Sequence, residues 1–227
     1  GPDLDALTDL KVRHPALGKA VVKLNEGFSG EGNAIFSYEG CPDSDFRSWV
    51  ASQLPSLRFT AVSENWEHFR EKYKQMGGVV ECFIDGEDKR SPSAQCRVNA
   101  LGEAMVISTH DQVLGGSDGQ IFQGCTFPAD EEYRLSIQAA GLKVAQVLAR
   151  KGVLGRFATD FVSVREGDQW RHYAIEVNVR KGGTTHPFLT LKFLTDGSYD
   201  ISTGMFHTPS GNPKYYFSSD TLERERY

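Results

Sequence analysis

The stretch YAIEVNVRKGGTTHP, residues 173–187, predicts the fold around it. Its first half alternates apolar and polar residues, which is typical of a strand whose two faces meet different surroundings. One face, which we expect to belong to a core, comprises Tyr173, Ile175, Val177 and Val179. The other face carries Glu176, Asn178 and Arg180. Carboxylate and amide oxygens suit a hard cation such as Mg²⁺, and a guanidinium suits phosphate oxygens.

A second strand makes this pattern more specific, since alternation alone also describes an ordinary half-exposed strand. Residues 157–165 are strand-like and are followed by the turn signature Glu166-Gly167-Asp168. In a hairpin centred on residue 168, with an odd-numbered loop, Asp160 pairs directly with Glu176, and direct partners share a face. Two facing carboxylates repel each other unless a cation lies between them. The pattern therefore predicts a Mg²⁺ site at Asp160, Glu176 and Asn178, provided that the register does not slip by one residue.

The composition is that of an ordinary globular chain. It has 227 residues, of which 39% are hydrophobic and 24% charged, with a net charge of -5 and no block of Lys and Arg. Nucleic-acid and membrane partners are therefore not expected. No apolar run approaches the roughly 18 residues of a membrane span. Gly1-Pro2 resembles the remnant of a cleaved tag, and no signal peptide is visible.

The four cysteines indicate a reducing compartment. Their spacing matches no metal motif, and Cys82, Cys96 and Cys125 lie in apolar, strand-like segments. Small buried side chains are the expected role for such residues. We therefore predict a cytoplasmic location.

The N-terminal third combines a strand, a glycine-rich loop and a second strand. We expect residues 1–19 to be a linker or tag remnant with a short helix, and strands at residues 20–24 and 34–38. Lys23 lies in the first strand, before the glycines of residues 27–32. Glycines let backbone N–H groups approach phosphate closely. A plain hairpin loop explains the same residues, and the order of lysine and loop fits neither a Walker A motif nor a protein kinase.

The rest of the chain predicts helices and antiparallel strands. The expected helices span residues 45–54, 64–76, 130–151 and 185–194, and the expected strands span residues 79–84, 93–100, 105–113 and 120–127. In the long helix, the predicted core stripe comprises Ile137, Ala140, Val144, Val147 and Leu148. The acidic segment Asp85–Asp88 after strand 79–84 fits either a hinge under a nucleotide or a β-turn.

This order of elements resembles the ATP-grasp superfamily, with Glu176-Val177-Asn178-Val179-Arg180 as its metal-and-phosphate signature. Four stretches resemble the pheganomycin-type peptide ligases more closely: STHDQVLGG at 108–116, GCTFPA at 124–129, GGTTHPF at 182–188 and TPSG at 208–211. The resemblance covers nearly the whole chain from about Ala20. It implies an α+β fold with a small lid subdomain at residues 20–84 and a large subdomain at residues 85–227.

The resemblance also implies roles for individual residues. For ATP, it implies Lys23, Ser29 and Gly30 at the phosphates, Glu81 with the backbone of Cys82 and Ile84 at adenine, and Asp88, or the adjacent Glu87, at the ribose. For the metal it implies Asp160, Glu176 and Asn178. Arg180 is expected to stabilise the transferring phosphoryl group. Arg97 is a second candidate for a phosphate contact, with an ordinary surface arginine as the alternative.

The function implied by the resemblance is carboxylate–amine ligation through an acyl-phosphate, with ATP and Mg²⁺ as cofactors and small molecules or peptides as substrates. Such enzymes carry a further N-terminal domain that contributes a second lysine and part of the substrate site. We expect that domain to be supplied in cis or in trans, and the chain alone to have little or no activity. Three alternatives stay open: a phosphotransferase, a non-catalytic nucleotide-binding module and a purely structural domain.

Overall fold

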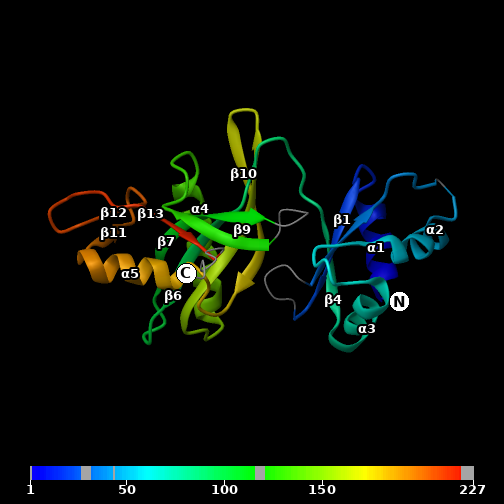
Figure 1. Ribbon diagram of the computed structural model, residues 1–227, viewed down its shortest axis with the longest axis horizontal. Helices are drawn as coiled ribbons and strands as arrows, with labels where there is room; N and C mark the ends of the chain where they lie inside the picture. Colours follow the sequence, from blue (N-terminus) through cyan, green and yellow to red (C-terminus); the bar gives the residue numbers. More distant parts are fainter. Residues whose placement is uncertain (1, 27–31, 43, 116–120, 221–227) are drawn as a thin grey trace, which may run out of the picture. The chain divides into compact units, whose positions relative to one another are not determined.

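The computed structural model describes residues 2–26, 32–42, 44–115 and 121–220, and only the backbone of Pro2 and Asp3. The chain divides into two compact units (Figure 1). The N-terminal unit comprises Gly1–Ile84 with Gly115–Phe122, and the C-terminal unit comprises Asp85–Leu114 with Gln123–Tyr227. Both units combine antiparallel strands with helices, which confirms the predicted α+β class. No helix within the described ranges is long and apolar enough to cross a membrane.

The N-terminal unit is built on a sheet with the strand order β3-β2-β1-β4. Its strands are β1 (Lys19–Leu24), β2 (Asn33–Ser37), β3 (Arg58–Phe59) and β4 (Gly78–Cys82). Burial alternates along β1, because Ala20, Val22 and Leu24 face the core. The three longer strands confirm those predicted from the sequence, while β3 was not predicted.

Helices complete this unit: α1 (Pro2–Arg13), α2 (Phe46–Gln53), α3 (Trp66–Met76) and the short 3₁₀ helix η1 (Leu54–Ser56). The bounds of α3 have clear chemical causes. The Asn65 side chain accepts a hydrogen bond from the His68 backbone N–H at 3.0 Å, so it caps the first turn. Gly77, with a φ of 73°, ends the helix in a conformation that favours glycine.

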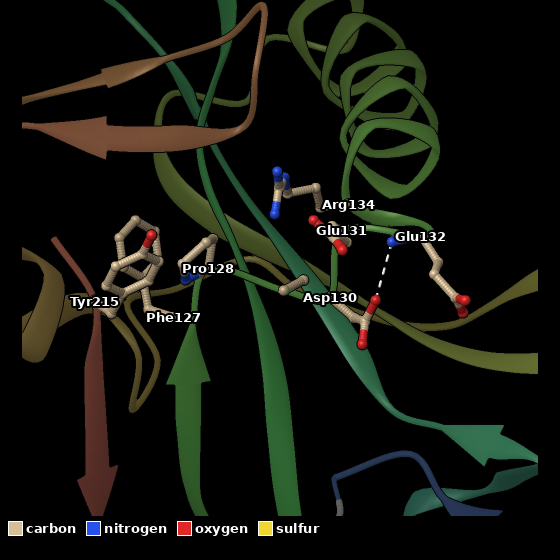
Figure 2. A pocket seen from close by; sticks show the side chains of 8 residues that line it. Phe127, Pro128, Asp130, Glu131, Glu132, Arg134 and Tyr215 are labelled. Carbon is tan, nitrogen blue, oxygen red and sulfur yellow. Dashed lines mark hydrogen bonds between the residues drawn. The ribbon is translucent and has the colours of Figure 1, made fainter. Parts of the chain in front are cut away.

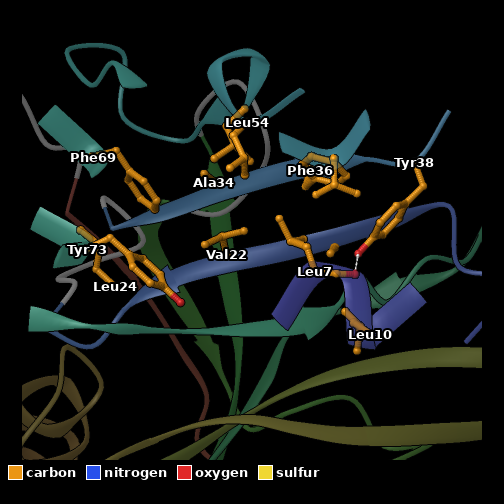
Figure 3. Packing of buried hydrophobic residues seen from close by; sticks show 13 residues of the cluster. Leu7, Leu10, Val22, Leu24, Ala34, Phe36, Tyr38, Leu54, Phe69 and Tyr73 are labelled. Carbon is orange, nitrogen blue, oxygen red and sulfur yellow. Dashed lines mark hydrogen bonds between the residues drawn. The ribbon is translucent and has the colours of Figure 1, made fainter. Parts of the chain in front are cut away.

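Helix α1 confirms the short helix expected within residues 1–19 and corrects the expectation that this segment is a linker or tag remnant. Figure 3 shows Leu7 and Leu10 packed into the core beside Val22 and Phe36. Leu7 is completely buried, and its backbone carbonyl accepts a hydrogen bond from the Tyr38 hydroxyl at 2.8 Å. The helix forms part of the unit because these leucines lie on one side of it. In so short a segment, this spacing was too weak a signal to predict burial.

The C-terminal unit is built on a larger antiparallel sheet with the order β10-β9-β6-β7-β8-β13. Its strands are β6 (Pro92–Val98), β7 (Ala104–Gly115), β8 (Ile121–Phe127), β9 (Gly155–Glu166), β10 (Gln169–Asn178) and β13 (Tyr216–Ser219). The short β5 (Lys89–Arg90) also pairs with β9, and β11 (Ser198–Asp200) pairs with β12 (Met205–His207). The helices are α4 (Arg134–Arg150) and α5 (Thr185–Thr195).

Helix α4 packs on one face of this sheet. Its Ile137 lies in one buried cluster with Ala94 of β6 and Phe161 of β9, and its Ala145 lies in another with Cys96 and Phe157. The fully buried line is Ile137, Gly141 and Ala145, whereas Val147 is 43% exposed. The predicted core stripe was therefore partly wrong. A Cβ at Gly141 would lie 2.6 Å from the Ala94 Cβ, so glycine permits the close approach.

The apolar face predicted for β10 is not a buried core. Tyr173 is 37% exposed, Val177 41% and Val179 56%. The reason is topological: β10 is an edge strand, while α4 packs against β6 and β9 further into the sheet. The predicted face is also not a single face, because the register shifts by one residue between Ala174 and Glu176. Tyr173 pairs with Val162 and lies on the face of Asp160, whereas Val177 pairs with Thr159 on the face that α4 covers. Alternation in the sequence therefore identified the strand correctly and assigned its two faces wrongly.

We predict that Leu7→Ala lowers the free energy of unfolding by about 3 kcal/mol, because it leaves a cavity in the N-terminal core. The matched control is Val12→Ala on the same helix, where the side chain is 68% exposed and little apolar area is lost. Chemical denaturation followed by far-UV circular dichroism gives both values. Equal stabilities of the two variants would contradict the packing of α1.

Candidate active site

The hairpin of β9 and β10 brings two carboxylates face to face. Asp160 pairs directly with Glu176, which confirms the predicted pairing. The predicted odd-numbered loop was wrong, because Glu166 pairs with Gln169 across the two-residue turn Gly167-Asp168. That turn alone would place Asp160 opposite Ile175. A bulge between Ala174 and Glu176 shifts the register by one residue and makes the carboxylates partners.

Asp160 of β9 is held by hydrogen bonds from the two strands beside it, β6 and β10. The Ser93 hydroxyl of β6 donates to its Oδ1 at 2.6 Å, and the Asn178 amide of β10 donates to its Oδ2 at 2.9 Å. Ser93 in turn accepts a hydrogen bond from the Gln95 amide at 3.0 Å. Ser93 is 2% exposed and Gln95 7%. Both oxygens of the Asp160 carboxylate are thus fixed in direction by buried or half-buried donors.

Sequence reasoning missed Ser93 and Gln95. The signal was present, because Ser93, Gln95 and Arg97 alternate with Ala94, Cys96 and Val98 along one strand. The register places Ser93 opposite Asp160 and Gln95 opposite Ala158, so these side chains share the face of Asp160. Their period of two indicated a polar face, but nothing in the sequence paired that strand with residues 155–160.

Burial dominates the electrostatics of Asp160 and raises its pKa to about 6. Hydrogen bonds from Ser93 and Asn178 lower the pKa, the facing Glu176 raises it, and the nearby positive charge of Arg180 lowers it. Since the pKa remains raised despite Arg180, the two carboxylates are only partly compensated by positive charge. A bound cation would supply the remainder.

The donor set fits Mg²⁺. It consists of the carboxylates of Asp160 and Glu176 and the amide oxygen of Asn178, which is left available because the amide nitrogen binds Asp160. Mg²⁺ takes one or two protein carboxylates and completes its shell with water and phosphate oxygens. Among the residues that the structure describes, no group of three or more His, Cys, Asp or Glu forms a metal cluster. The Asp160 site differs from such clusters, because its third oxygen donor is an amide.

The two predicted arginines have different surroundings. Arg180 follows β10, and its backbone N–H bonds to the Asn178 carbonyl at 2.7 Å, so the chain turns sharply there. Its charge acts on Asp160. Arg97 lies in β6 on the same face as Ser93, and its direct partner on β9 is Arg156.

In the N-terminal unit, the predicted phosphate and adenine residues lie close together. Lys23 of β1 forms an ion pair with Glu81 of β4. Cys82 pairs with Ala20, and the next residue, Phe83, donates its backbone N–H to the Lys19 carbonyl at 3.1 Å. Ile84 lies two residues after β4 and ends the first segment of this unit. Ser29 and Gly30 lie outside the described residues.

Asp88 is engaged on the helix-covered side of the C-terminal sheet. Its carboxylate pairs with Arg165 at 3.1 Å and with Arg90 at 3.0 Å. Arg165 also contacts Glu132, which accepts a hydrogen bond from the Trp170 indole at 2.9 Å. Strands β5 and β6 pair with β9 in one continuous register. Lys89 pairs with Val164 and therefore lies on the same face as Asp160, whereas the neighbouring Asp88 lies on the opposite face.

A separate hollow of about 420 Å³ lies before α4 and contains none of the predicted site residues. Figure 2 shows its lining, with Asp130, Glu131, Glu132 and Arg134 on one side and Phe127, Pro128 and Tyr215 on the other. The Glu132 backbone N–H donates to the Asp130 carboxylate at 2.9 Å. The Asp130 carboxylate thus binds a local backbone N–H, and the Glu132 carboxylate pairs with Arg165.

Comparison with known proteins gives a family and one curated relative. The model of the IQCH-like ATP-grasp family matches residues 43–202. The L-propargylglycine–L-glutamate ligase of Streptantibioticus cattleyicolor is 36% identical over 159 residues, which make up 70% of this chain and 31% of that protein. The chain therefore spans about a third of the length of this relative.

Solved structures show the same fold at low identity. The biotin carboxylase domain of the Hydrogenobacter thermophilus 2-oxoglutarate carboxylase, in complex with MgADP and bicarbonate, has a TM-score of 0.57 at 17% identity, covering 88% of this chain and 38% of that one. The N5-carboxyaminoimidazole synthetase of Staphylococcus aureus, complexed with ADP, has a TM-score of 0.52 at 14% identity, covering 87% and 43%.

The raised pKa of Asp160 predicts a pH-dependent stability without metal. Between about pH 4 and pH 6, folded Asp160 keeps a proton that the unfolded chain releases, so the free energy of unfolding falls as the pH rises, by up to about 3 kcal/mol. Chemical denaturation of wild type and Asp160→Asn in metal-free buffer, at several pH values, measures the contribution of Asp160 to the free energy of unfolding. A stability difference between the two that stays constant from pH 4 to pH 7 contradicts the prediction.

Proposed function

This chain belongs to the ATP-grasp family, and we propose that it is the ATP- and Mg²⁺-binding part of a carboxylate–amine ligase that works through an acyl-phosphate. The single observation that carries the proposal is the pairing of Asp160 with Glu176, with Asn178 hydrogen-bonded to Asp160. This arrangement has a chemical purpose if a cation binds it, because the two carboxylates otherwise repel each other in a partly buried setting.

In this proposal, Asp160, Glu176 and Asn178 hold Mg²⁺, and Ser93 orients the carboxylate of Asp160. Bound Mg²⁺ would neutralise charge on the terminal phosphates of ATP. Arg180 adds positive charge on the side of Asp160 and stabilises the phosphoryl group during transfer. The protein positions and neutralises charged groups, and the reaction needs no covalent nucleophile on the chain.

Lys23 and Glu81 are proposed to hold the phosphates and the adenine amino group, together with the loop residues Ser29 and Gly30 and the backbone of Cys82 and Ile84. In the structure Lys23 and Glu81 pair with each other, so nucleotide binding replaces one ion pair by two separate contacts. For the ribose, the engagement of Asp88 by two arginines favours the alternative acid, Glu87.

The proposed substrate class follows from the curated relative, whose name describes a ligase that joins two amino acids. We propose that the carboxylate of one amino acid or peptide attacks the γ-phosphate of ATP, which forms an acyl-phosphate and releases ADP. The amine of a second one then attacks the acyl carbon, and the amide bond forms with release of phosphate and a proton. A phosphotransferase differs only in the acceptor, which would be a hydroxyl group, so acceptor chemistry distinguishes the two functions.

The metal assignment predicts that Glu176→Gln loses most of the Mg²⁺ stimulation of ADP affinity. Loss of one charged contact in a partly buried site costs about 1.5–3 kcal/mol, or roughly ten- to a hundredfold in affinity. The matched control is Glu166→Gln, which removes an equal charge from the far end of the same hairpin. Calorimetric titration with and without MgCl₂ measures the stimulation. Equal Mg²⁺ stimulation of ADP affinity in wild type, Glu176→Gln and Glu166→Gln would contradict the metal assignment.

The ligase assignment predicts a hydroxamate when hydroxylamine traps the acyl-phosphate. The assay contains ATP, Mg²⁺ and one amino acid at a time, starting with L-glutamate, and is run on this chain and on the longer protein that contains it. We expect little hydroxamate from the chain alone, robust formation by the longer protein and loss in its Arg180→Ala variant. Phosphorylation of a hydroxyl group without any hydroxamate would instead indicate a phosphotransferase.

A further inference from the structure

Two arginines face each other across β6 and β9. Arg97 pairs directly with Arg156, so both side chains project from the same face, with Cβ atoms roughly 5 Å apart. Like charges in this position destabilise a sheet. Among the described residues, no carboxylate forms an ion pair with either arginine, and neither guanidinium donates a hydrogen bond.

This pair differs from three arginines at the other end of β9 and the hairpin. Arg90 and Arg165 pair with Asp88, and Arg171 pairs with Glu166 at 2.8 Å. Partial burial and the charge of Arg97 lower the pKa of Arg156. The protein therefore places two cations together where the described chain offers no compensating anion.

The location of the pair relates it to the proposed site. Gln95 and Arg97 continue the face that carries Ser93, and Arg156 continues the face of β9 that carries Asp160. Arg156 lies four positions before Asp160, which is about 13 Å along a strand. The segment proposed to contact the nucleoside lies on the other side of Asp160 along β9, because the adjoining Lys89 and Arg90 pair with Val164 and Ser163.

The order along β9 is thus nucleoside segment, metal residues, arginine pair. Attacking and leaving oxygens lie roughly in line at the transferring phosphorus. A substrate that attacks the γ-phosphate consequently lies on the far side of the metal from the nucleoside, which is the side of Arg97 and Arg156. An arginine side chain spans about half of the 13 Å, so the pair reaches a group several bonds from the reacting carboxylate.

We propose that Arg97 and Arg156 together bind a non-reacting carboxylate of an amino-acid or peptide substrate. Guanidinium groups bind carboxylates bidentately, and two of them suit a single anion that also relieves their mutual repulsion. This inference deepens the proposed function and rests on it for the orientation of the substrate. Arg156 thus has a role in substrate binding, and Arg97 contacts the substrate instead of the phosphates of ATP.

The test uses the 227-residue chain and succinate, a dicarboxylate with no amine, as the probe. Nε–H signals of Arg97 and Arg156 are followed by ¹⁵N NMR and assigned from the variants Arg97→Gln and Arg156→Gln. At constant ionic strength, succinate should shift both signals with saturation, and either variant should weaken its affinity at least tenfold. Mg·ADP affinity should stay within twofold of wild type. Arg171→Gln, which removes an equal charge elsewhere on the hairpin, should leave both affinities unchanged.

Three results would overturn the inference: no saturable shift with succinate, saturation of both signals by Mg·ADP alone, or a response to inorganic phosphate without one to succinate. Thermal unfolding guards against misfolded variants, because succinate should raise the melting temperature of wild type and not that of Arg156→Gln. Failure here, with Mg²⁺-dependent ADP binding intact, refutes only the carboxylate subsite. Succinate binding without Mg²⁺-dependent ADP binding refutes the proposed function and leaves the subsite in place.

Discussion

The opposition of two carboxylates, Asp160 on β9 and Glu176 on β10, is the constraint on which the C-terminal unit depends. It exists because a bulge at Ile175 inserts one residue into an otherwise regular hairpin. Without that residue, the two-residue turn at Gly167-Asp168 would pair Asp160 with an isoleucine. The bulge thus creates a repulsive pair in a sheet that could have avoided it, which is the behaviour expected of a site selected for cation binding.

The rest of the sheet supports this pair from one side. Gln95 and Ser93 of β6 form a buried chain of hydrogen bonds to Asp160, while Ala94 and Cys96 of the same strand pack against α4. Helix packing therefore fixes the strand, and the strand fixes the direction of the carboxylate. A site built on strands held in this way positions its charged groups more firmly than a site on loops.

Particular residues show how much of the fold and of the candidate site could be predicted from the sequence. The Asp160–Glu176 pair was predicted, although from a hairpin centre that the structure does not have. The bulge was invisible, because Ile175 is as apolar as its neighbours Tyr173 and Val177. The single apolar face predicted for this strand was wrong for the same reason, because the bulge places Tyr173 and Val177 on opposite faces of the sheet. Ser93, Gln95 and Arg156 needed the pairing of β6 with β9, which links residues more than 50 positions apart in the chain.

Location of the metal tests the central claim most directly. Crystals of the chain grown with Mn²⁺ and ADP allow the cation to be found from its anomalous scattering alone. The account predicts one strong peak at a coordination distance of roughly 2.1 Å from oxygens of Asp160 and Glu176, with the Asn178 amide oxygen facing it. ADP bound with no anomalous peak at these residues, or with the peak elsewhere on the chain, would contradict it.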